Sequence, residues 1–248
     1  MSPLLLTTLL FILLVSSVTS TRWQQHQQPL GELAAQRVDL TLGVMSRCPD
    51  AVFTETALDS VIERVNDKVR LRFEYIGNFT DSSQHDVGVT EVGGVVCKHG
   101  DQECHGNIHQ LCVQHALRPS RAGKDYDLSP SAAQRKVWDF VQCQNYDGLA
   151  QIGTDALAKQ CLGLVKGPKW EGEDGIGACA NGDEGRALLR DSVQVSKKRG
   201  IIKSATIQLE GKTICVRDGG EWKECPGGHE TRDFVRQIEE AWRRKNGQ

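Results

Sequence analysis

A sixteen-residue segment from Cys97 to Cys112 constrains this chain more than any other stretch. It reads Cys-Lys-His-Gly-Asp-Gln-Glu-Cys-His-Gly-Asn-Ile-His-Gln-Leu-Cys, with cysteines at both ends and at Cys104. Cysteines this close together are typical either of a metal site or of a disulfide framework, and the redox compartment decides between the two. The rest of the chain indicates which one applies.

The N-terminus predicts passage into the secretory pathway. An apolar run from Leu4 to Val15 is followed by the small residues Ser16 to Ser20. Twelve residues are too few to cross a bilayer of roughly 30 Å as a helix. We therefore predict a signal peptide over residues 1–20, with an uncleaved anchor as the alternative, and no membrane span after cleavage. No further address separates secretion from delivery to a vacuole or lysosome.

Disulfides are permitted in that pathway, and the nine cysteines then form a framework with an odd member. Cys215 and Cys225 flank Asp218-Gly-Gly220 and can pair with each other. Six others can form three pairs in any of fifteen ways: Cys97, Cys104, Cys112, Cys143, Cys161 and Cys179. Cys48 is left over and is predicted to be a free thiol, the alternatives being a half-cystine or a buried inert thiol.

Other ligand classes are not favoured. His105 and His109 are four residues apart, a spacing that suits zinc on one helix face. With the cysteines bridged only imidazoles remain, so we predict no metal and no resident cofactor. A net charge of −2 points away from nucleic acid. Asn78-Phe-Thr80 is a glycosylation sequon, which we place in an exposed loop.

Residues 21–36 are Gln-rich and predict a disordered leader, and residues 37–248 predict a single domain. The patterns of this domain indicate a first strand–helix–strand unit, a helical insert and a final unit of two helices and two strands. Alternating apolar residues over 38–44 and 69–75 predict two strands, and helical periodicity over 51–66 predicts a helix between them. Cys48-Pro49 stands at the start of that helix, where proline is tolerated. A strand, a cysteine at a helix start, a helix and a strand are typical of a thioredoxin-like fold.

The middle region, about 80–182, predicts a helical insert with helices near 106–117, 131–144 and 153–164. Glu171 to Gly185 is interpreted as a flexible acidic loop. A helix over 186–198, a hairpin of strands 205–209 and 213–217, and a final amphipathic helix follow. The expected fold class is α/β, a mixed sheet with a thioredoxin-like core and a disulfide-bonded helical insertion.

The motif of the Cys97–Cys112 segment resembles that of the gamma-interferon-inducible lysosomal thiol reductase family, C-Q-H-G-x-x-E-C-x-x-N-x-x-x-x-C, with Lys98 in place of Gln. Residues 45–51 and 217–222 are similar to the fungal branch of that family. The resemblance covers residues 38–242 and implies a thioredoxin-like thiol–disulfide oxidoreductase with Cys48 as nucleophile. The helix N-terminus and its free N–H groups would stabilise a Cys48 thiolate.

The chain also departs from the pattern of that family. The C-x-x-C motif reads Cys48-Pro-Asp-Ala51, so the resolving thiol is absent. The stretch Ile202 to Thr206 lacks the proline that thioredoxin-like enzymes place beside the nucleophile. By this resemblance, the residues expected to line a substrate groove are Pro49, Asp50, Ala205 and Thr206.

Three hypotheses follow for the function. In the first, Cys48 attacks a disulfide of a protein substrate, and an external thiol such as glutathione resolves the adduct. In the second, the chain is a catalytically silent secreted binding protein with a thioredoxin fold. In the third, Cys48 links two copies of the chain in a disulfide-bonded homodimer.

Overall fold

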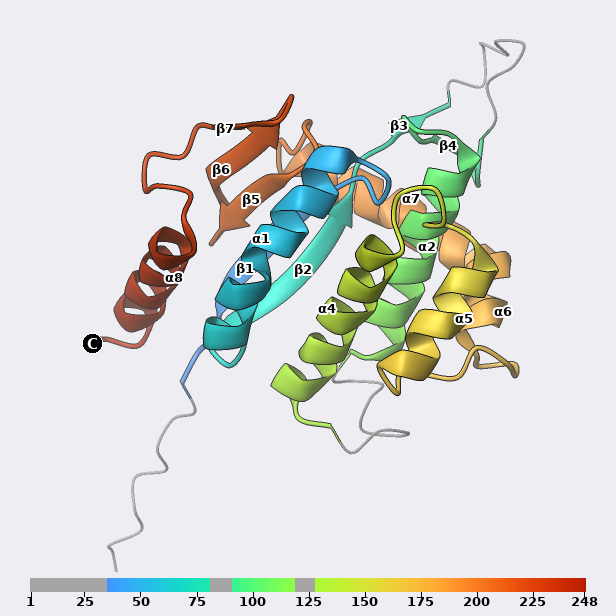
Figure 1. Ribbon diagram of the computed structural model, residues 1–248, viewed down its shortest axis with the longest axis horizontal. Coiled ribbons are helices and arrows are strands. Elements are labelled where there is room, and N and C mark those ends of the chain that lie inside the picture. Colours follow the sequence, from blue (N-terminus) through green and yellow to red (C-terminus); the bar gives the residue numbers. More distant parts are fainter. Residues whose placement is uncertain (1–34, 81–90, 119–127) are drawn as a thin grey trace, which may run out of the picture. The chain divides into compact units, whose positions relative to one another are not determined.

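A computed structural model describes residues 35–80, 91–118 and 128–248 (Figure 1). Gln36–Gln248 form one compact unit. The predicted signal peptide and leader fall almost wholly outside the described residues and stay predictions. Among the described residues, no helix combines the length and apolarity needed to cross a bilayer. The order of elements is β1 (Val38–Val44), α1 (Pro49–Val65), β2 (Val69–Tyr75), β3 (Asn78–Phe79), β4 (Val95–Val96), α2 (Asp101–Ala116), α4 (Pro130–Tyr146), α5 (Asp155–Leu164), α6 (Ile176–Asn181), α7 (Asp183–Lys198), β5 (Thr206–Leu209), β6 (Lys212–Asp218), β7 (Glu221–Lys223) and α8 (Thr231–Lys245).

The main sheet has the strand order β2-β1-β5-β6-β7. β1 and β2 are parallel and are joined through α1, whereas β5 runs antiparallel to β1 and β6 antiparallel to β5. Helix α7 leads into β5, and α8 follows β7. This is the connectivity of a thioredoxin-like core, a mixed α/β sheet, and it confirms the predicted fold class.

Alternation along β1 separates the two faces of the sheet. Val38, Leu40, Leu42 and Val44 are at most 1 % exposed and belong to the core cluster that α1 and α8 also enter. Burial of such side chains contributes about 1.5–3 kcal/mol each. Helices α1 and α8 pack against each other, and α7 lies behind the sheet in the view of Figure 1, packed on β2.

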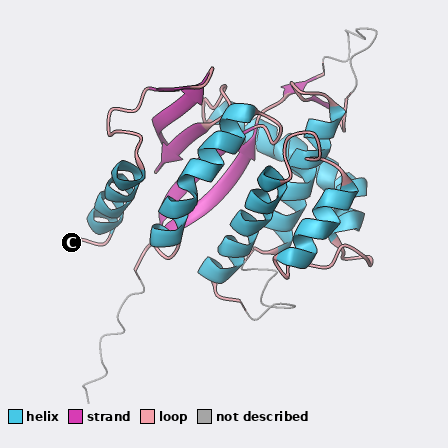
Figure 2. Cartoon of the chain, viewed as in Figure 1, coloured by secondary structure: helices cyan, strands magenta, loops and turns pink. Residues whose placement is uncertain are grey.

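The helical insert packs beside β2, the edge strand of the sheet (Figure 2). Side chains from this half of the molecule satisfy the backbone N–H groups that the edge leaves free. Gln134 of α4 accepts from Leu71 N–H at 2.8 Å, and Gln114 of α2 accepts from Phe73 N–H at 3.0 Å. Because an open edge is a template for aggregation, the insert also protects the sheet.

Four disulfides are present. Three lie within the insert: Cys97–Cys104, Cys112–Cys179 and Cys143–Cys161. The fourth, Cys215–Cys225, joins β6 to the segment after β7. Cys48 is the free cysteine. The described residues contain no group of three or more His, Cys, Asp or Glu side chains arranged to hold a metal ion.

Three local expectations were wrong. Glu171–Gly185 is not a loop throughout, because α6 occupies its second half; the Cys112–Cys179 disulfide anchors this short helix, and Ile176 is 1 % exposed. Asn78 lies in the two-residue strand β3, where it pairs with Val96 and stays exposed, rather than in a loop. The short strand β7 was not predicted.

Candidate active site around Cys48

Cys48 follows the carboxyl end of β1 and caps the N-terminus of α1. Its φ and ψ of −82° and 124° are extended, and Pro49 occupies the first turn of the helix. Cys48 N–H donates to Met45 O at 2.9 Å, and Val52 N–H donates to Cys48 O at 3.1 Å. The thiol is half-buried and makes no hydrogen bond with the other described residues. It is therefore accessible and stands at the positive end of a helix dipole, which stabilises an anion.

Signature residues of the insert hold the segment that leads to Cys48. Ser46 N–H donates to Asn107 Oδ1 at 3.0 Å, and Ser46 Oγ donates to the Glu103 carbonyl at 3.2 Å. Both contacts are buried. A Cβ at Gly106 would meet Ser46 Oγ at 2.6 Å, so only glycine lets α2 approach this closely. The Cys97–Cys112 segment thus supports the loop that leads to Cys48.

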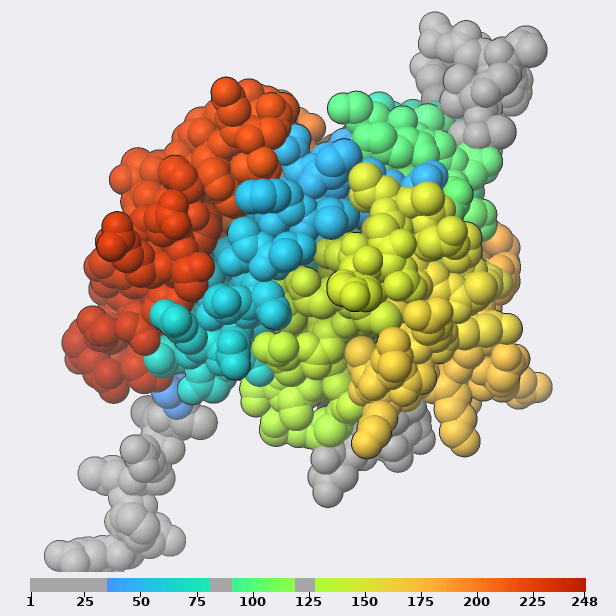
Figure 3. Space-filling model, viewed as in Figure 1, coloured from blue at the N-terminus to red at the C-terminus, as the bar shows by residue number. Residues whose placement is uncertain are grey.

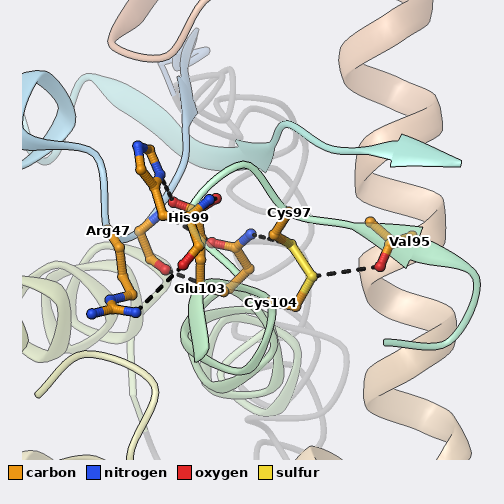
Figure 4. Close-up of a disulfide and its surroundings, with 8 residues drawn as sticks. Arg47, Val95, Cys97, His99, Glu103 and Cys104 are labelled. Atoms are coloured by element: carbon orange, nitrogen blue, oxygen red, sulfur yellow. Dashed lines mark hydrogen bonds and ion pairs between the residues drawn. A yellow bond between two sulfur atoms is a disulfide. The ribbon is translucent and has the colours of Figure 1, made fainter. Parts of the chain in front are cut away.

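Figure 4 shows the same support from the side of Arg47. The Arg47 guanidinium donates to Leu149 O at 2.9 Å and to His99 O at 3.4 Å. His99 in turn donates its backbone N–H to the buried Glu103 carboxylate, which also contacts the His99 ring. Arg47 therefore anchors its own loop to the insert through two carbonyl oxygens.

On the other side of α1, Asp50 binds the β6–β7 hairpin. Its carboxylate accepts the N–H groups of Gly219 and Gly220 at 2.9 and 3.0 Å. Both glycines have positive φ, of 66° and 81°, which presents their N–H groups to the carboxylate. Arg217 Nε lies 3.3 Å from the same carboxylate, and its guanidinium stacks on Phe53 at 3.6 Å from the ring centroid. The negative charge of Asp50 is thereby held by partners other than Cys48.

Helix α1 thus lies between two supports, as the space-filling view shows, with the hairpin side on its left and the insert on its right (Figure 3). Phe53 is 49 % exposed and contacts Trp222 of β7 edge to face at 6.3 Å between ring centroids. The first turns of α1 therefore present an exposed aromatic ring that packs on the hairpin.

The residue three positions after Cys48 is buried, and so are the last two residues of the proline-free stretch Ile202 to Thr206. Ala51 is 0 % exposed, so the position of the second cysteine in the C-x-x-C motif is packed into the core. Ala205 is 1 % exposed and has φ of 60°, a left-handed conformation uncommon for a residue with a side chain. Thr206 is 5 % exposed and donates its hydroxyl to Lys203 O at 2.7 Å.

The predicted groove residues therefore differ in what they offer a substrate. Pro49 is exposed next to Cys48. Asp50 is engaged by the hairpin. Ala205 and Thr206 are buried, and Ala205 O accepts Arg217 N–H at 3.1 Å. Ser204 Oγ, three residues before Ile207 of β5, accepts Met45 N–H at 3.0 Å and so ties this segment to the Cys48 loop.

Sequence reasoning missed several supporting residues. It did not identify Asn107 and the Glu103 carbonyl as acceptors for Ser46. The contact of Asp50 with Gly219 and Gly220 was also missed. The sequence Asp218-Gly-Gly220 did offer a signal, because it indicates a turn and the N–H groups of a turn need acceptors. The Ser46–Asn107 contact joins residues 61 positions apart, and the Asp50–Gly219 contact joins residues 169 positions apart. Sequence periodicity carries no information over such separations.

One protein family and several solved structures resemble this chain. The family model described as "Gamma interferon inducible lysosomal thiol reductase (GILT)" matches residues 39–165, just over half of the chain. No curated protein sequence matches. Among solved structures, a candidate protein disulfide isomerase from Nitrosomonas europaea is similar at 12% identity and a TM-score of 0.49, covering 86% of this chain and 100% of that one. Reduced DsbA1 from Neisseria meningitidis is similar at 12% identity and a TM-score of 0.43, covering 86% and 88%. On the family match, this chain belongs to the gamma interferon inducible lysosomal thiol reductase family.

Proposed function

We propose that the protein is a monothiol thiol–disulfide oxidoreductase in which Cys48 is the nucleophile. Membership in a thiol reductase family supports an oxidoreductase-like function. The observation that carries the proposal further is the state of the cysteines. Cys48 alone is free, half-buried and at a helix N-terminus, whereas the other eight are bridged.

The reaction needs two external thiols per substrate disulfide. The Cys48 thiolate attacks one sulfur of the substrate, the substrate S–S bond breaks, and the second substrate sulfur leaves as a thiolate that takes up a proton. Glutathione then attacks Cys48 Sγ and releases the substrate sulfur that Cys48 had attacked as a thiol. This step leaves glutathione bound to Cys48 by a disulfide. A second glutathione frees Cys48 as oxidised glutathione forms. The substrate disulfide gains the two electrons that two glutathione thiols lose.

Protein substrates suit the surface around Cys48. Exposed Pro49 and Phe53 and the half-buried Trp222 provide apolar contact area beside the thiol. The four disulfides and the family support an oxidising compartment of the secretory or lysosomal pathway as the place of action. Glycosylation at the exposed Asn78 fits the same route.

A specific observation favours the second hypothesis, a silent binding protein. Ala51 is fully buried, and the stretch Ile202 to Thr206 contains no proline. In that case Cys48 would be dispensable. The homodimer hypothesis also uses Cys48, and a band that halves in mass on reduction would reveal it.

The test is disulfide reduction with glutathione as the only reductant. We expect measurable turnover by the native chain and loss of at least a thousandfold in Cys48→Ser, with unchanged unfolding. Ala51→Cys is the matched gain-of-function variant, because residues three apart in a helix lie within the Cα separation a disulfide needs. Its introduced thiol should release the substrate without glutathione. Equal rates in the native chain and Cys48→Ser would support the silent scaffold.

A further inference from the structure

A second feature of the molecule lies away from Cys48: a cavity of about 510 Å³ beside the outer edge of β2. Its floor is β2, and its walls are the end of α2 and the start of α4. The register pairs Arg72, in the middle of the floor, with Thr41 of β1. Cys48 is seven residues beyond Thr41, past the far end of β1. The cavity and the thiol therefore stand at different ends of the β1–β2 pair.

The cavity is lined by four arginines and one carboxylate among the described residues. The arginines are Arg37, Arg70, Arg72 and Arg118, and the carboxylate is Glu74. Arg70 is neutralised by Asp39, to which it donates at 2.7 and 3.0 Å. Four guanidiniums thus face two carboxylates, which leaves an excess of two positive charges around one concavity.

The excess charge has no partner within the described part of the chain. Arg72 and Arg118 are exposed and form no side-chain ion pair there, and Arg37 donates only to Val69 O at 3.4 Å. Burial lowers the pKa of Arg37, and the neighbouring Arg70 charge lowers it further. Like charges are therefore held together, an arrangement that an anion would relieve.

Glu74, one of the two carboxylates counted above, offsets the arginine charges only in part. Burial raises the pKa of its carboxyl, against the influence of Arg199, Arg72 and Arg118, and Ser192 Oγ donates to it at 2.8 Å. The neutral polar groups of the lining are also committed. Gln114 and Gln134 bond to the edge of β2 and to Asn66, so the guanidiniums are the donors left for a ligand.

The remaining lining is apolar. Leu71, Leu117 and Val137 line the same cavity, and Leu117 and Val137 are 3 % and 6 % exposed. A cavity of this volume holds a small organic molecule. Guanidinium groups bind carboxylates and phosphates through paired N–H donors, which gives both charge and geometry.

We infer that this arginine-lined cavity is a binding site for a small soluble organic anion carrying two or more carboxylate or phosphate groups. The site is independent of the thiol chemistry, and its occupant adds contacts between β2 and the insert. A flat membrane surface cannot enter a concavity of this kind, so the expected occupant is a solute rather than a lipid bilayer.

Calorimetric titration of the full mature chain with citrate and with pyrophosphate, at constant ionic strength, tests the inference. We expect saturable one-to-one binding of at least one probe. Arg72→Gln and Arg118→Gln should each weaken it at least tenfold. Arg244→Gln makes the same charge change at an exposed position outside the cavity and should leave the affinity unchanged. Cys48→Ser should bind as the native chain does, which separates this site from the proposed reaction.

Three results would overturn the inference. The first is the absence of saturable binding by either probe. The second is an equal loss in Arg244→Gln, which would indicate a general charge effect. The third is co-sedimentation with anionic phosphatidylserine vesicles without binding of either solute, which would assign the arginines to a membrane surface.

Discussion

The helical insert and the surroundings of Cys48 are stabilised in opposite ways. Three disulfides cross-link the insert, and its cysteines are largely buried; Cys104 and Cys161 are 0 % exposed. The loop before Cys48 is held by hydrogen bonds alone, from Asn107, Glu103, Leu149 and Ser204. Covalent bonds thus fix the scaffold, while the one free thiol remains outside the framework. The difference teaches that the insert positions the loop before Cys48 without a covalent bond to it.

The largest expected effect concerns the seam between the two regions. Glu55 of α1 is 2 % exposed and accepts from Asn145 of α4 at 2.7 Å, and burial raises its pKa from 4.5 to about 8. Between these values the unfolded chain has released the proton and the folded chain retains it. The folded state therefore loses stability as pH rises, by up to about 5 kcal/mol at 1.4 kcal/mol per pKa unit.

Glu55→Gln keeps the acceptor and removes the charge, so its stability should not fall over this range. Urea unfolding at pH 6.5 and 8.5 measures the difference. His109 does not interfere there, because burial lowers its pKa to about 4 and its contribution is lost only as pH falls below 6.5. A parallel decline in Glu55→Gln would show that other groups cause the pH dependence.

Removal of a disulfide should cost more stability for a longer closed loop, rising with the logarithm of loop length. Cys112–Cys179 closes a separation of 67 residues and Cys97–Cys104 one of 7. In the chain-entropy model their removal as paired Ala variants costs about 4 and about 2.5 kcal/mol. Denaturant unfolding of both variants checks the order. The reverse order would mean that Cys97–Cys104 acts mainly through the Cys48 loop.

Ala205 offers a test of the substrate edge. Its φ of 60° is incompatible with the φ of about −65° that proline imposes, so Ala205→Pro should cost about 3 kcal/mol or more and restore no activity. Ala205→Gly is the control, because glycine accepts positive φ, and it should stay within about 1 kcal/mol. A stable Ala205→Pro with raised turnover would show that the segment rearranges readily.

The smallest effect on stability has the most specific consequence for the thiol. Asn107→Ala leaves the buried Ser46 N–H unpaired and should cost about 1–3 kcal/mol while changing the alkylation rate of Cys48. Asn181→Ala removes an amide that bonds only within α6, to Gly177 O at 3.0 Å, and should leave that rate unchanged. Equal rates in both variants would separate the signature segment from the nucleophile.

The sequence was sufficient to predict the elements that have a local pattern. Alternation fixed β1 and β2, and periodicity found α1, most helices of the insert and α8. It failed at α6, which is held by the bridge from Cys179 to Cys112, 67 residues away. It also failed at β7, which pairs with its neighbour β6 but has only 3 residues, too few to show alternation. The same limit applies to the site. Cys48 was predictable from its place after a strand, but the contacts that hold its loop come from residues 52 or more positions away, apart from those within the loop itself.

Trapping the chain with oxidised glutathione at controlled pH tests the central claim most directly. Mass spectrometry of the mature chain, without denaturation before the thiols are blocked, identifies every modified cysteine. We predict one glutathione adduct, on Cys48, that disappears with release of free thiol when reduced glutathione is added. An unmodified Cys48, or an adduct that reduced glutathione does not remove, would contradict the monothiol reaction.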